Sequence, residues 1–207
     1  TGNYHQVTSR IYTDFGLMTA DADIGVDTHK LFQQISGLGP VIELSRLLQS
    51  PFSLHQSIMR KIEREIAHAQ AGKPARIIAK MNALNEASVV ELLYKASCAG
   101  VHIDLIVRGA CTIKPGVPGI SDNIRVRSIV GRFLEHSRIY WFANGGEAEI
   151  FCSSADWMER NLLRRFEVCF PILDAELAQR VYDEGPENSL ADNTPAWIRH
   201  AAGPTET

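Results

Sequence analysis

Two apolar segments near the middle of the chain decide its fold: ARIIAKM at residues 75–81 and VHIDLIV at residues 101–107. Each has the length and the branched side chains typical of a buried strand. Between them, apolar residues recur at helical spacing from Asn85, a candidate N-cap, to Ala99, and Gly100 follows as a candidate C-cap. Strand, helix and strand in this order predict a βαβ unit with two parallel strands.

The segments on either side extend this unit. Apolar residues recur every four positions from Leu54 to Ile66, which predicts an amphipathic helix over 54–69. Asn144-Gly145-Gly146 is typical of a tight turn between two strands. The remaining elements that we expect are strands at 124–130, 137–143, 149–153 and 166–170 and a last helix at 174–183. Together they predict an α/β fold with a mixed sheet flanked by helices.

The chain divides into three parts by pattern. Residues 1–40 carry a strand-like stretch near Tyr12 and helical spacing over 27–35, and Gly37 to Pro40 form a linker. Residues 41–183 form the α/β domain, and residues 184–207 form a polar, turn-rich tail that we expect to be poorly held. Because the chain opens on Thr1 without an initiator Met, we expect a piece cut from a longer protein.

Composition limits the classes of function. The chain has 207 residues and a formal charge of −3, so any site for a polyanion must be a local cluster, and we expect no nucleic-acid partner. Its four cysteines lie far apart without a CxxC pair, which predicts reduced thiols in a cytoplasmic protein rather than a zinc site. No apolar stretch reaches 18 residues, no signal peptide is visible, and no histidines have metal-ligand spacing. Walker, Rossmann and HExxH motifs are also absent.

Three features carry candidate chemistry. Arg108, followed by Gly109, ends the predicted strand 101–107, and ligands collect at the carboxyl ends of such strands. His136 and Arg138 lie two residues apart, so they share one face of an extended chain and suit phosphoryl chemistry. The stretch 153–157 (SSADW) offers hydroxyls and an acid that could orient the histidine. Each has a structural alternative: a surface ion pair, a solvated strand face, and a helix N-cap beside a buried Trp.

Read together, these segments resemble the carboxyl-terminal region of the polyphosphate kinase family, over 1 to about 182. The matching stretches are TGNY at 1–4, RIYTD at 10–14, KMN at 80–82, LIVRG at 105–109, GISDNIR at 119–125, LEH at 134–136, NGG at 144–146 and SSADWM at 153–158. Beyond Tyr182 the chain departs from the family pattern. The order and number of these stretches make the resemblance specific.

The resemblance implies a phospholipase-D-like fold and the reversible transfer of the terminal phosphate of ATP to inorganic polyphosphate. It implies that a phosphorylated histidine lies upstream of Thr1, in a preceding catalytic half of which residues 1–40 are the end. The magnesium ligands would also lie outside this chain, which would then be an inactive fragment by itself. The family further implies ATP, ADP and polyphosphate as partners and a homo-oligomer.

The resemblance also implies roles for individual residues. The family's ATP-contacting tyrosine falls on Tyr12, its arginine on Arg108 and its second histidine on His136. His136 would act as acid or base, and Arg108 would neutralise phosphate oxygens. The phospholipase-D pattern expects His-x-Lys, whereas this chain has Arg138, which leaves Arg138 as a phosphate clamp.

Two other functions stay open at this point. The chain could be a phospholipase-D-like phosphodiesterase that uses His136 as its own nucleophile. It could also be a polyphosphate-binding or oligomerisation module without activity. In that case a local basic groove would be formed by Arg108, Arg125, Arg127, Arg132 and Arg138.

Overall fold

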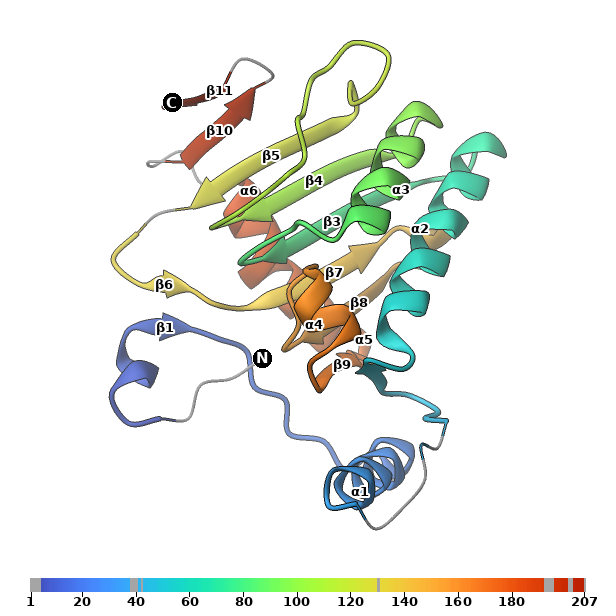
Figure 1. The fold of residues 1–207 in the computed structure, drawn as a ribbon, viewed down its shortest axis with the longest axis vertical. Coiled ribbons are helices and arrows are strands. Elements are labelled where there is room, and N and C mark those ends of the chain that lie inside the picture. The colour runs from blue at the N-terminus through green and yellow to red at the C-terminus, as the bar shows by residue number, and fades with distance from the viewer. Residues whose placement is uncertain are drawn as a thin grey trace.

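A nine-stranded mixed sheet forms the centre of the computed structural model, which describes residues 5–37, 41, 43–129, 131–191, 196–200 and 203–206. Figure 1 shows this sheet with helices on both faces. The strand order is β11-β10-β5-β4-β3-β7-β8-β9-β2. The bounds are Leu48–Ser50 (β2), Arg76–Met81 (β3), His102–Val107 (β4), Ile124–Ile129 (β5), Arg138–Phe142 (β7), Glu149–Ser153 (β8), Glu167–Pro171 (β9), Ala196–His200 (β10) and Gly203–Glu206 (β11).

The predicted βαβ unit is confirmed. β3 and β4 are parallel, with Ile77 opposite Ile103, and β5 continues the parallel order beside β4. Helix α3 (Ala87–Cys98) connects β3 to β4. Its N-cap is Glu86 rather than the expected Asn85, because the Glu86 carboxylate accepts the backbone N–H groups of Ser88 and Val89. The later strands β7, β8 and β9 are antiparallel, so the sheet is mixed as predicted.

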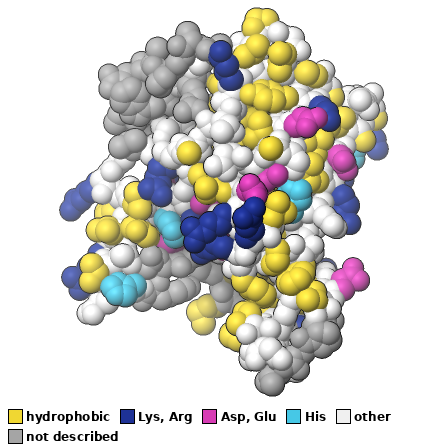
Figure 2. Space-filling model, in the orientation of Figure 1, with side chains coloured by type: hydrophobic (Ala, Val, Ile, Leu, Met, Phe, Trp, Pro, Cys, Tyr) yellow, Lys and Arg dark blue, Asp and Glu magenta, His cyan; other side chains and the backbone are white. Residues whose placement is uncertain are grey.

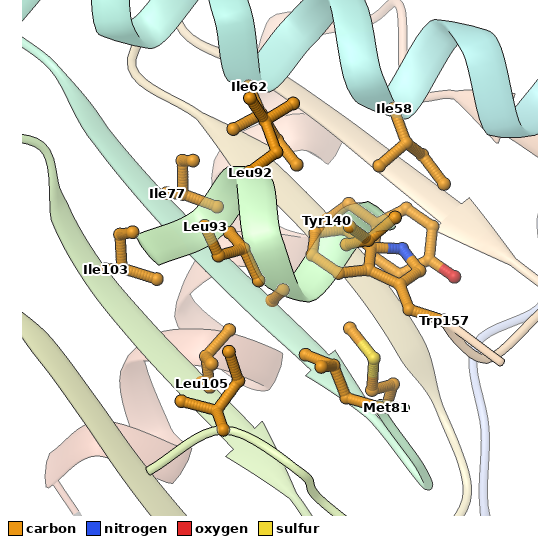
Figure 3. Close-up of a cluster of buried hydrophobic side chains, with 14 of the residues drawn as sticks. Ile58, Ile62, Ile77, Met81, Leu92, Leu93, Ile103, Leu105, Tyr140 and Trp157 are labelled. Atoms are coloured by element: carbon orange, nitrogen blue, oxygen red, sulfur yellow. The ribbon is translucent and has the colours of Figure 1, made fainter. Parts of the chain in front are cut away.

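Helices cover both faces of the sheet (Figure 1). One face carries α2 (Leu54–Gln70), α3 and α4 (Glu159–Leu163), and the other carries α5 (Ala175–Tyr182) and α6 (Asn188–Ala191). Figure 3 shows the core beneath α2 and α3, where Ile62 and Leu93 meet Ile77 of β3. All three side chains are fully buried, and each contributes about 1.5–3 kcal/mol of hydrophobic stabilisation.

The turn between β7 and β8 agrees with its sequence. A single 3-10 turn, η2 (Asn144–Gly146), joins these antiparallel strands. All three of its residues have positive φ angles, a conformation that glycine and asparagine adopt more easily than other residues. The predicted turn is therefore confirmed.

The amino-terminal segment forms a short strand outside the main sheet and then a helix. A short turn, η1 (Thr8–Arg10), precedes β1 (Tyr12–Thr13), which pairs in parallel with β6 (Leu134–Glu135) apart from the main sheet. Helix α1 (Ala22–Ile35) follows, and it begins five residues earlier than the helical spacing over 27–35 indicated, because Asp21 caps the Ile24 N–H. Residues 1–4 and 38–40, which include the TGNY stretch and most of the expected linker, lie outside the described residues.

The carboxyl-terminal segment corrects the expectation of a poorly held tail. After α5, the wide helical turn η3 (Asp183–Glu187) and α6 pack on the sheet, and Gly185 and Ser189 are buried. A Cβ atom at Gly185 would lie 2.5 Å from Ile139 Cδ1, so glycine permits this close approach. β10 then pairs antiparallel with β5. The expectation of a loose tail rested on polar composition, which gives no information about this strand pairing. Residues 192–195, 201–202 and 207 lie outside the described part of the chain.

No helix in the described part of the chain is both long and apolar enough to cross a membrane.

Candidate functional site

The candidate site lies where β3 and β4 end and β7 begins. Because β7 runs antiparallel to β3, its first residue, Arg138, stands beside the carboxyl end of β3. β6 and the segment before β7 bring His136 to the same place, and β1 lies against β6. Figure 2 shows Lys, Arg, His and acidic side chains together near the middle of this face, between β6 and α4. Arg138, His136 and Tyr12, predicted from distant parts of the chain, therefore meet.

Both ring nitrogens of His136 form hydrogen bonds. Its Nδ1 lies 3.0 and 3.1 Å from the two carboxylate oxygens of Asp14, and its Nε2 lies 2.9 Å from Arg138 Nη1. A guanidinium only donates, so Nε2 must accept, and the ring proton sits on Nδ1 and is donated to Asp14. This arrangement defines a neutral imidazole with one tautomer. The Tyr12 ring packs beside it, with a centroid separation of 4.9 Å.

Arg138 is the connection between this histidine and the sheet. Its Nε and Nη2 donate to the two oxygens of Asp156, at 3.2 and 3.3 Å, and only about a tenth of either side chain is exposed. Asp156 also accepts the backbone N–H of Asn82 at 2.7 Å. One carboxylate therefore fixes the start of β7 against the end of β3, which orients the guanidinium that contacts His136.

Arg108 is oriented without losing its charge. Its Nε and Nη2 both donate to the amide oxygen of Asn82, at 3.0 and 2.8 Å. An amide oxygen is neutral, so the guanidinium keeps its positive charge for an anion. Gly109 permits the arrangement, because its N–H donates to Asn82 O at 2.7 Å and a Cβ there would lie 2.8 Å from the same oxygen.

A pocket of about 430 Å³ opens beside the histidine support. Asp14, Lys80, Glu135 and Ser137 supply polar groups to its wall. Lys80 is almost fully buried and its Nζ donates to Glu135 at 2.6 Å, so the charge of this lysine is compensated inside the protein. Arg180, which also lines the pocket, is paired with Glu184 at 2.6 Å, so both cations of the lining have carboxylate partners.

The stretch 153–157 contributes one residue to the site. Ser153 and Ser154 bond to β9, and Trp157 is fully buried in the core, which is the structural alternative considered for it. Only Asp156 joins the network, through Arg138 rather than through the histidine directly. Sequence reasoning assigned no role to Asp14 or Asn82. Both lie in stretches quoted for the family resemblance, which was the one available signal.

The arginines expected to form one basic groove are separated. Arg108 and Arg138 belong to the candidate site, whereas Arg125 and Arg127 line a different pocket on β5. Arg132 packs over the ring of Phe133, 5.7 Å from its centroid. A single continuous groove of these five side chains is therefore not formed.

The site residues do not fit a magnesium ion. Among the described residues, no three His, Cys, Asp or Glu side chains gather as a metal site. The two carboxylates at the centre are already engaged, Asp14 by His136 and Asp156 by Arg138 and Asn82. No step of the chemistry is therefore assigned to a metal held by this chain.

Comparison with known sequences identifies the family. The family model described as polyphosphate kinase C-terminal domain 2 matches residues 47–206, and the one described as polyphosphate kinase C-terminal domain 1 matches residues 1–40. The chain belongs to the polyphosphate kinase family. The match through residue 206 corrects the expectation that the chain departs from the family beyond Tyr182.

Curated polyphosphate kinases are similar along almost the whole chain. The protein from Xylella fastidiosa (strain Temecula1) is 66% identical over 197 residues, which are 95% of this chain and 28% of the relative. The Neisseria gonorrhoeae protein is 61% identical over 203 residues, 98% of this chain and 30% of the relative. The chain thus spans less than a third of the length of these polyphosphate kinases.

Solved structures agree on the fold. The polyphosphate kinase of Porphyromonas gingivalis superposes with a TM-score of 0.94 at 44% identity, over 100% of this chain and 32% of that one. Nuc, a phospholipase D family member from Salmonella typhimurium, has a TM-score of 0.50 at 11% identity, over 78% of this chain and 96% of that one. The second likeness concerns the fold alone, and it agrees with the predicted phospholipase-D-like α/β architecture.

Proposed function

We propose that this chain forms part of the active site of an enzyme that reversibly transfers the terminal phosphate of ATP to inorganic polyphosphate. Membership of the polyphosphate kinase family supports the reaction class. The observation that carries the site is the contact of Arg138 Nη1 with His136 Nε2, in a network that Asp156 and Asn82 extend to the charged Arg108. Two guanidiniums and an imidazole in one network are suited to a transferring phosphoryl group.

The proposed reaction has two balanced steps. In the first step, an imidazole nitrogen of the upstream histidine, which lies outside these 207 residues, forms a P–N bond. At the same time the bond from the γ-phosphorus to the ADP oxygen breaks. In the second, a terminal oxygen of polyphosphate forms a bond to phosphorus as the P–N bond breaks. Reversal of both steps makes ATP from ADP. Arg108 and Arg138 stabilise the negative oxygens of the group in transit.

His136 contributes a proton-transfer group to these steps. Its Nε2 accepts from Arg138 in the absence of substrate, and a phosphate oxygen that binds Arg138 would take over that N–H. The nitrogen would then face the phosphate and could accept or donate a proton, with Asp14 holding the Nδ1–H throughout. Tyr12, packed beside the imidazole, would contact the nucleotide by stacking or through its hydroxyl.

The division of the chain follows the same proposal. Residues 1–40 would be the end of a preceding catalytic half, residues 41–183 the phospholipase-D-like domain, and residues 184–207 a segment without a catalytic role. The family match to 1–40 as a separate domain supports the first boundary. Magnesium would be bound by residues outside this chain, since the carboxylates here are engaged. We also propose a homo-oligomer, on the family resemblance, and a cytoplasmic location, because the four cysteines form no disulfide.

Labelled ATP tests the location of the phosphohistidine. The purified chain is incubated with ATP labelled at the γ-phosphate, and acid-labile label on the protein is measured. We expect no label on the chain alone, and label when the chain replaces the matched segment of the Xylella fastidiosa enzyme. Label on the isolated chain would place a nucleophile within these residues and contradict the proposal.

A phosphodiesterase is the second candidate, favoured only by the fold likeness to a phospholipase D family member. Its nucleophile would be His136 Nε2, but that atom accepts from Arg138 at 2.9 Å, which reduces its nucleophilicity. Hydrolysis of bis(p-nitrophenyl) phosphate by the isolated chain, lost in His136→Ala, would support this candidate.

A module without activity is the third candidate. It would bind polyphosphate, and the chimeric enzyme that contains this chain would remain inactive.

A further inference from the structure

A second pocket contains arginines that the candidate site does not use. It has a volume of about 530 Å³, within the range of small-ligand pockets, and it lies against β4, β5 and β10. Its charged or titratable lining residues are Arg76, Asp104, Asp122, Arg125, Arg127 and His200. None of these residues contacts His136, Arg138 or Arg108 through a hydrogen bond or ion pair of the site described above.

The second pocket is displaced from the candidate site along the parallel strands. Arg76 is the first residue of β3, and Arg125 stands opposite Asp104, four residues before Arg108, whereas Arg127 stands opposite Ile106, two residues before Arg108. Four residues of a strand span roughly 13 Å. A phosphate bound at Arg125 would therefore be separate from one bound at Arg108.

Strand register gathers the cations on one face. Arg125 stands opposite Asp104 of β4, and Arg127 stands between Ile106 of β4 and Ile198 of β10. Residues two apart on a strand point to the same side, so both guanidiniums leave β5 on the face that α6 covers. Arg127 confirms this direction, because its Nη1 donates to the carbonyl oxygens of Ser189 and Leu190, at 3.1 and 2.6 Å.

The pocket keeps positive charge after its internal pairs are counted. Asp104 is paired with Arg76 at 2.7 Å. Asp122 accepts the Gly119 N–H at 2.6 Å and keeps its negative charge, because that donor is neutral. Arg127 is likewise oriented by neutral carbonyls, so its charge remains. Arg125 is exposed, and in the described part of the chain no carboxylate forms an ion pair with Arg125 or Arg127. Three arginines and two aspartates therefore leave the pocket with a formal charge of +1 in a chain of net charge −3.

We propose that this pocket is a second anion-binding site, which holds linked phosphates away from the candidate site. Guanidinium groups bind phosphate oxygens through paired N–H donors. Arg76 donates to Asp104 through Nε and Nη2, and the N–H groups of its Nη1 can add a third contact. The cations span β3 to β5, roughly 10 Å at the usual strand spacing, which exceeds a single phosphate. The choice of polyphosphate as the ligand rests on the proposed function, whereas the binding of linked phosphates does not.

The test substitutes Arg125. It is exposed and without an ion pair, so Arg125→Glu should reverse the charge without unfolding the chain. Arg125→Lys keeps the charge, and Arg60→Glu is a matched control, because Arg60 is an exposed arginine on α2, on the opposite face of the sheet. Circular dichroism verifies the fold of each variant.

The experiment titrates the chain with sodium polyphosphate, ATP or inorganic phosphate. Calorimetry gives affinity, and backbone amide shifts at 124–127 report the pocket itself. We expect polyphosphate to shift these amides in the parent chain, in Arg60→Glu and in Arg108→Ala. Affinity at this pocket should fall at least tenfold in Arg125→Glu and remain within about threefold in Arg125→Lys, since the first variant loses a charge-assisted contact and the second keeps the charge.

Each outcome is decisive. No response of these amides to polyphosphate or ATP, or an unchanged affinity in Arg125→Glu, would overturn the site. A response to ATP without one to polyphosphate would support a site for linked phosphates and assign it to a nucleotide. An equal response to inorganic phosphate would overturn the claim for linked phosphates. The labelling experiment on the phosphohistidine is independent, so either proposal can fail alone.

Discussion

The arginines of the candidate site and those of the second pocket are held in different ways. At the candidate site, Arg138 is bound by the buried carboxylate of Asp156, and Arg108 is bound by the amide of Asn82. In the second pocket, Arg127 is held by two carbonyls, and Arg125 is exposed. A site that stabilises a transition state needs fixed geometry, whereas a site that holds a flexible anion needs mainly charge. We therefore expect substitutions to have large effects at the candidate site and smaller ones at the second pocket.

The largest effect should come from His136. In the chimeric enzyme, His136→Ala should lower the rate of polyphosphate synthesis by about 10²–10⁴-fold, because a positioned proton-transfer group is lost. Arg60→Ala is the control. Arg60 is an exposed residue of α2 and takes no part in the site, so this substitution should leave the rate unchanged. The measurement is incorporation of labelled phosphate from ATP at saturating substrates. A rate within a few fold of the parent would remove His136 from the chemistry.

Two aspartates test how the arginines are supported. Asp156→Asn leaves the guanidinium of Arg138 unpaired in a site that is about one-tenth exposed, and the free energy of unfolding should fall by about 3 kcal/mol. Asp104→Asn removes the partner of Arg76, which is more exposed, and the loss should be about 1 kcal/mol or less. Urea unfolding at neutral pH measures both. Equal losses of unfolding free energy in the two variants would contradict the expected difference between the candidate site and the second pocket.

Two glycines give a matched pair in the backbone. Gly109→Ala forces a methyl group to within 2.8 Å of Asn82 O, so we expect about 2 kcal/mol of destabilisation and a displaced Arg108. Gly116, at the rim of the second pocket, has a φ of 69° with open space around it, so Gly116→Ala should cost about 1 kcal/mol for the left-handed conformation alone. Thermal unfolding compares them. A larger cost at Gly116 would reverse the expected order.

The smallest effect concerns two tyrosines at high pH. Burial raises the pKa of Tyr140 well above its ordinary value, and burial raises the pKa of Tyr182 to a lesser degree, with Glu187 as the next cause. A raised pKa means that the folded state keeps the proton longer, so this stabilisation is full below pH 10 and is lost as pH rises through the folded pKa. Tyr140→Phe should flatten the fall in stability above pH 10 more than Tyr182→Phe. Urea unfolding between pH 8 and 11 measures the slopes, and equal slopes in both variants would contradict the ordering.

Local pattern was sufficient for the centre of the fold. The segments at 75–81 and 101–107 each carry an unbroken apolar face, which α2 and α3 bury. Their other face mixes Ile78 and Ile106 with charged residues, among them Lys80 and Asp104. The amphipathic spacing from Leu54 to Ile66 likewise required a covered face, and the structure confirms it. Helix ends were less certain, as at Glu86, because a carboxylate one residue further along caps the helix as well as Asn85 would.

The two termini show why pattern alone failed elsewhere. The tail after Asp183 is polar, yet it packs because Arg127 binds its carbonyl groups and Gly185 fits against Ile139. Asp14 carried no motif of its own that marked it as the partner of His136, 122 residues away. Both contacts depend on which strands lie side by side. That choice is made by packing and not by local preference.

By itself, the sequence determined the α/β class and the βαβ unit, and through its resemblance to a family it predicted Tyr12, Arg108, His136 and Arg138 as site residues. Periodicity and short motifs are local, so they are readable along one chain. Only the tertiary structure decided that Asp156 supports Arg138, that Asn82 supports Arg108, and that β5 carries its arginines into a separate pocket. These relations arise from strand order and register, because a carboxylate orients a guanidinium only after burial has brought the two together.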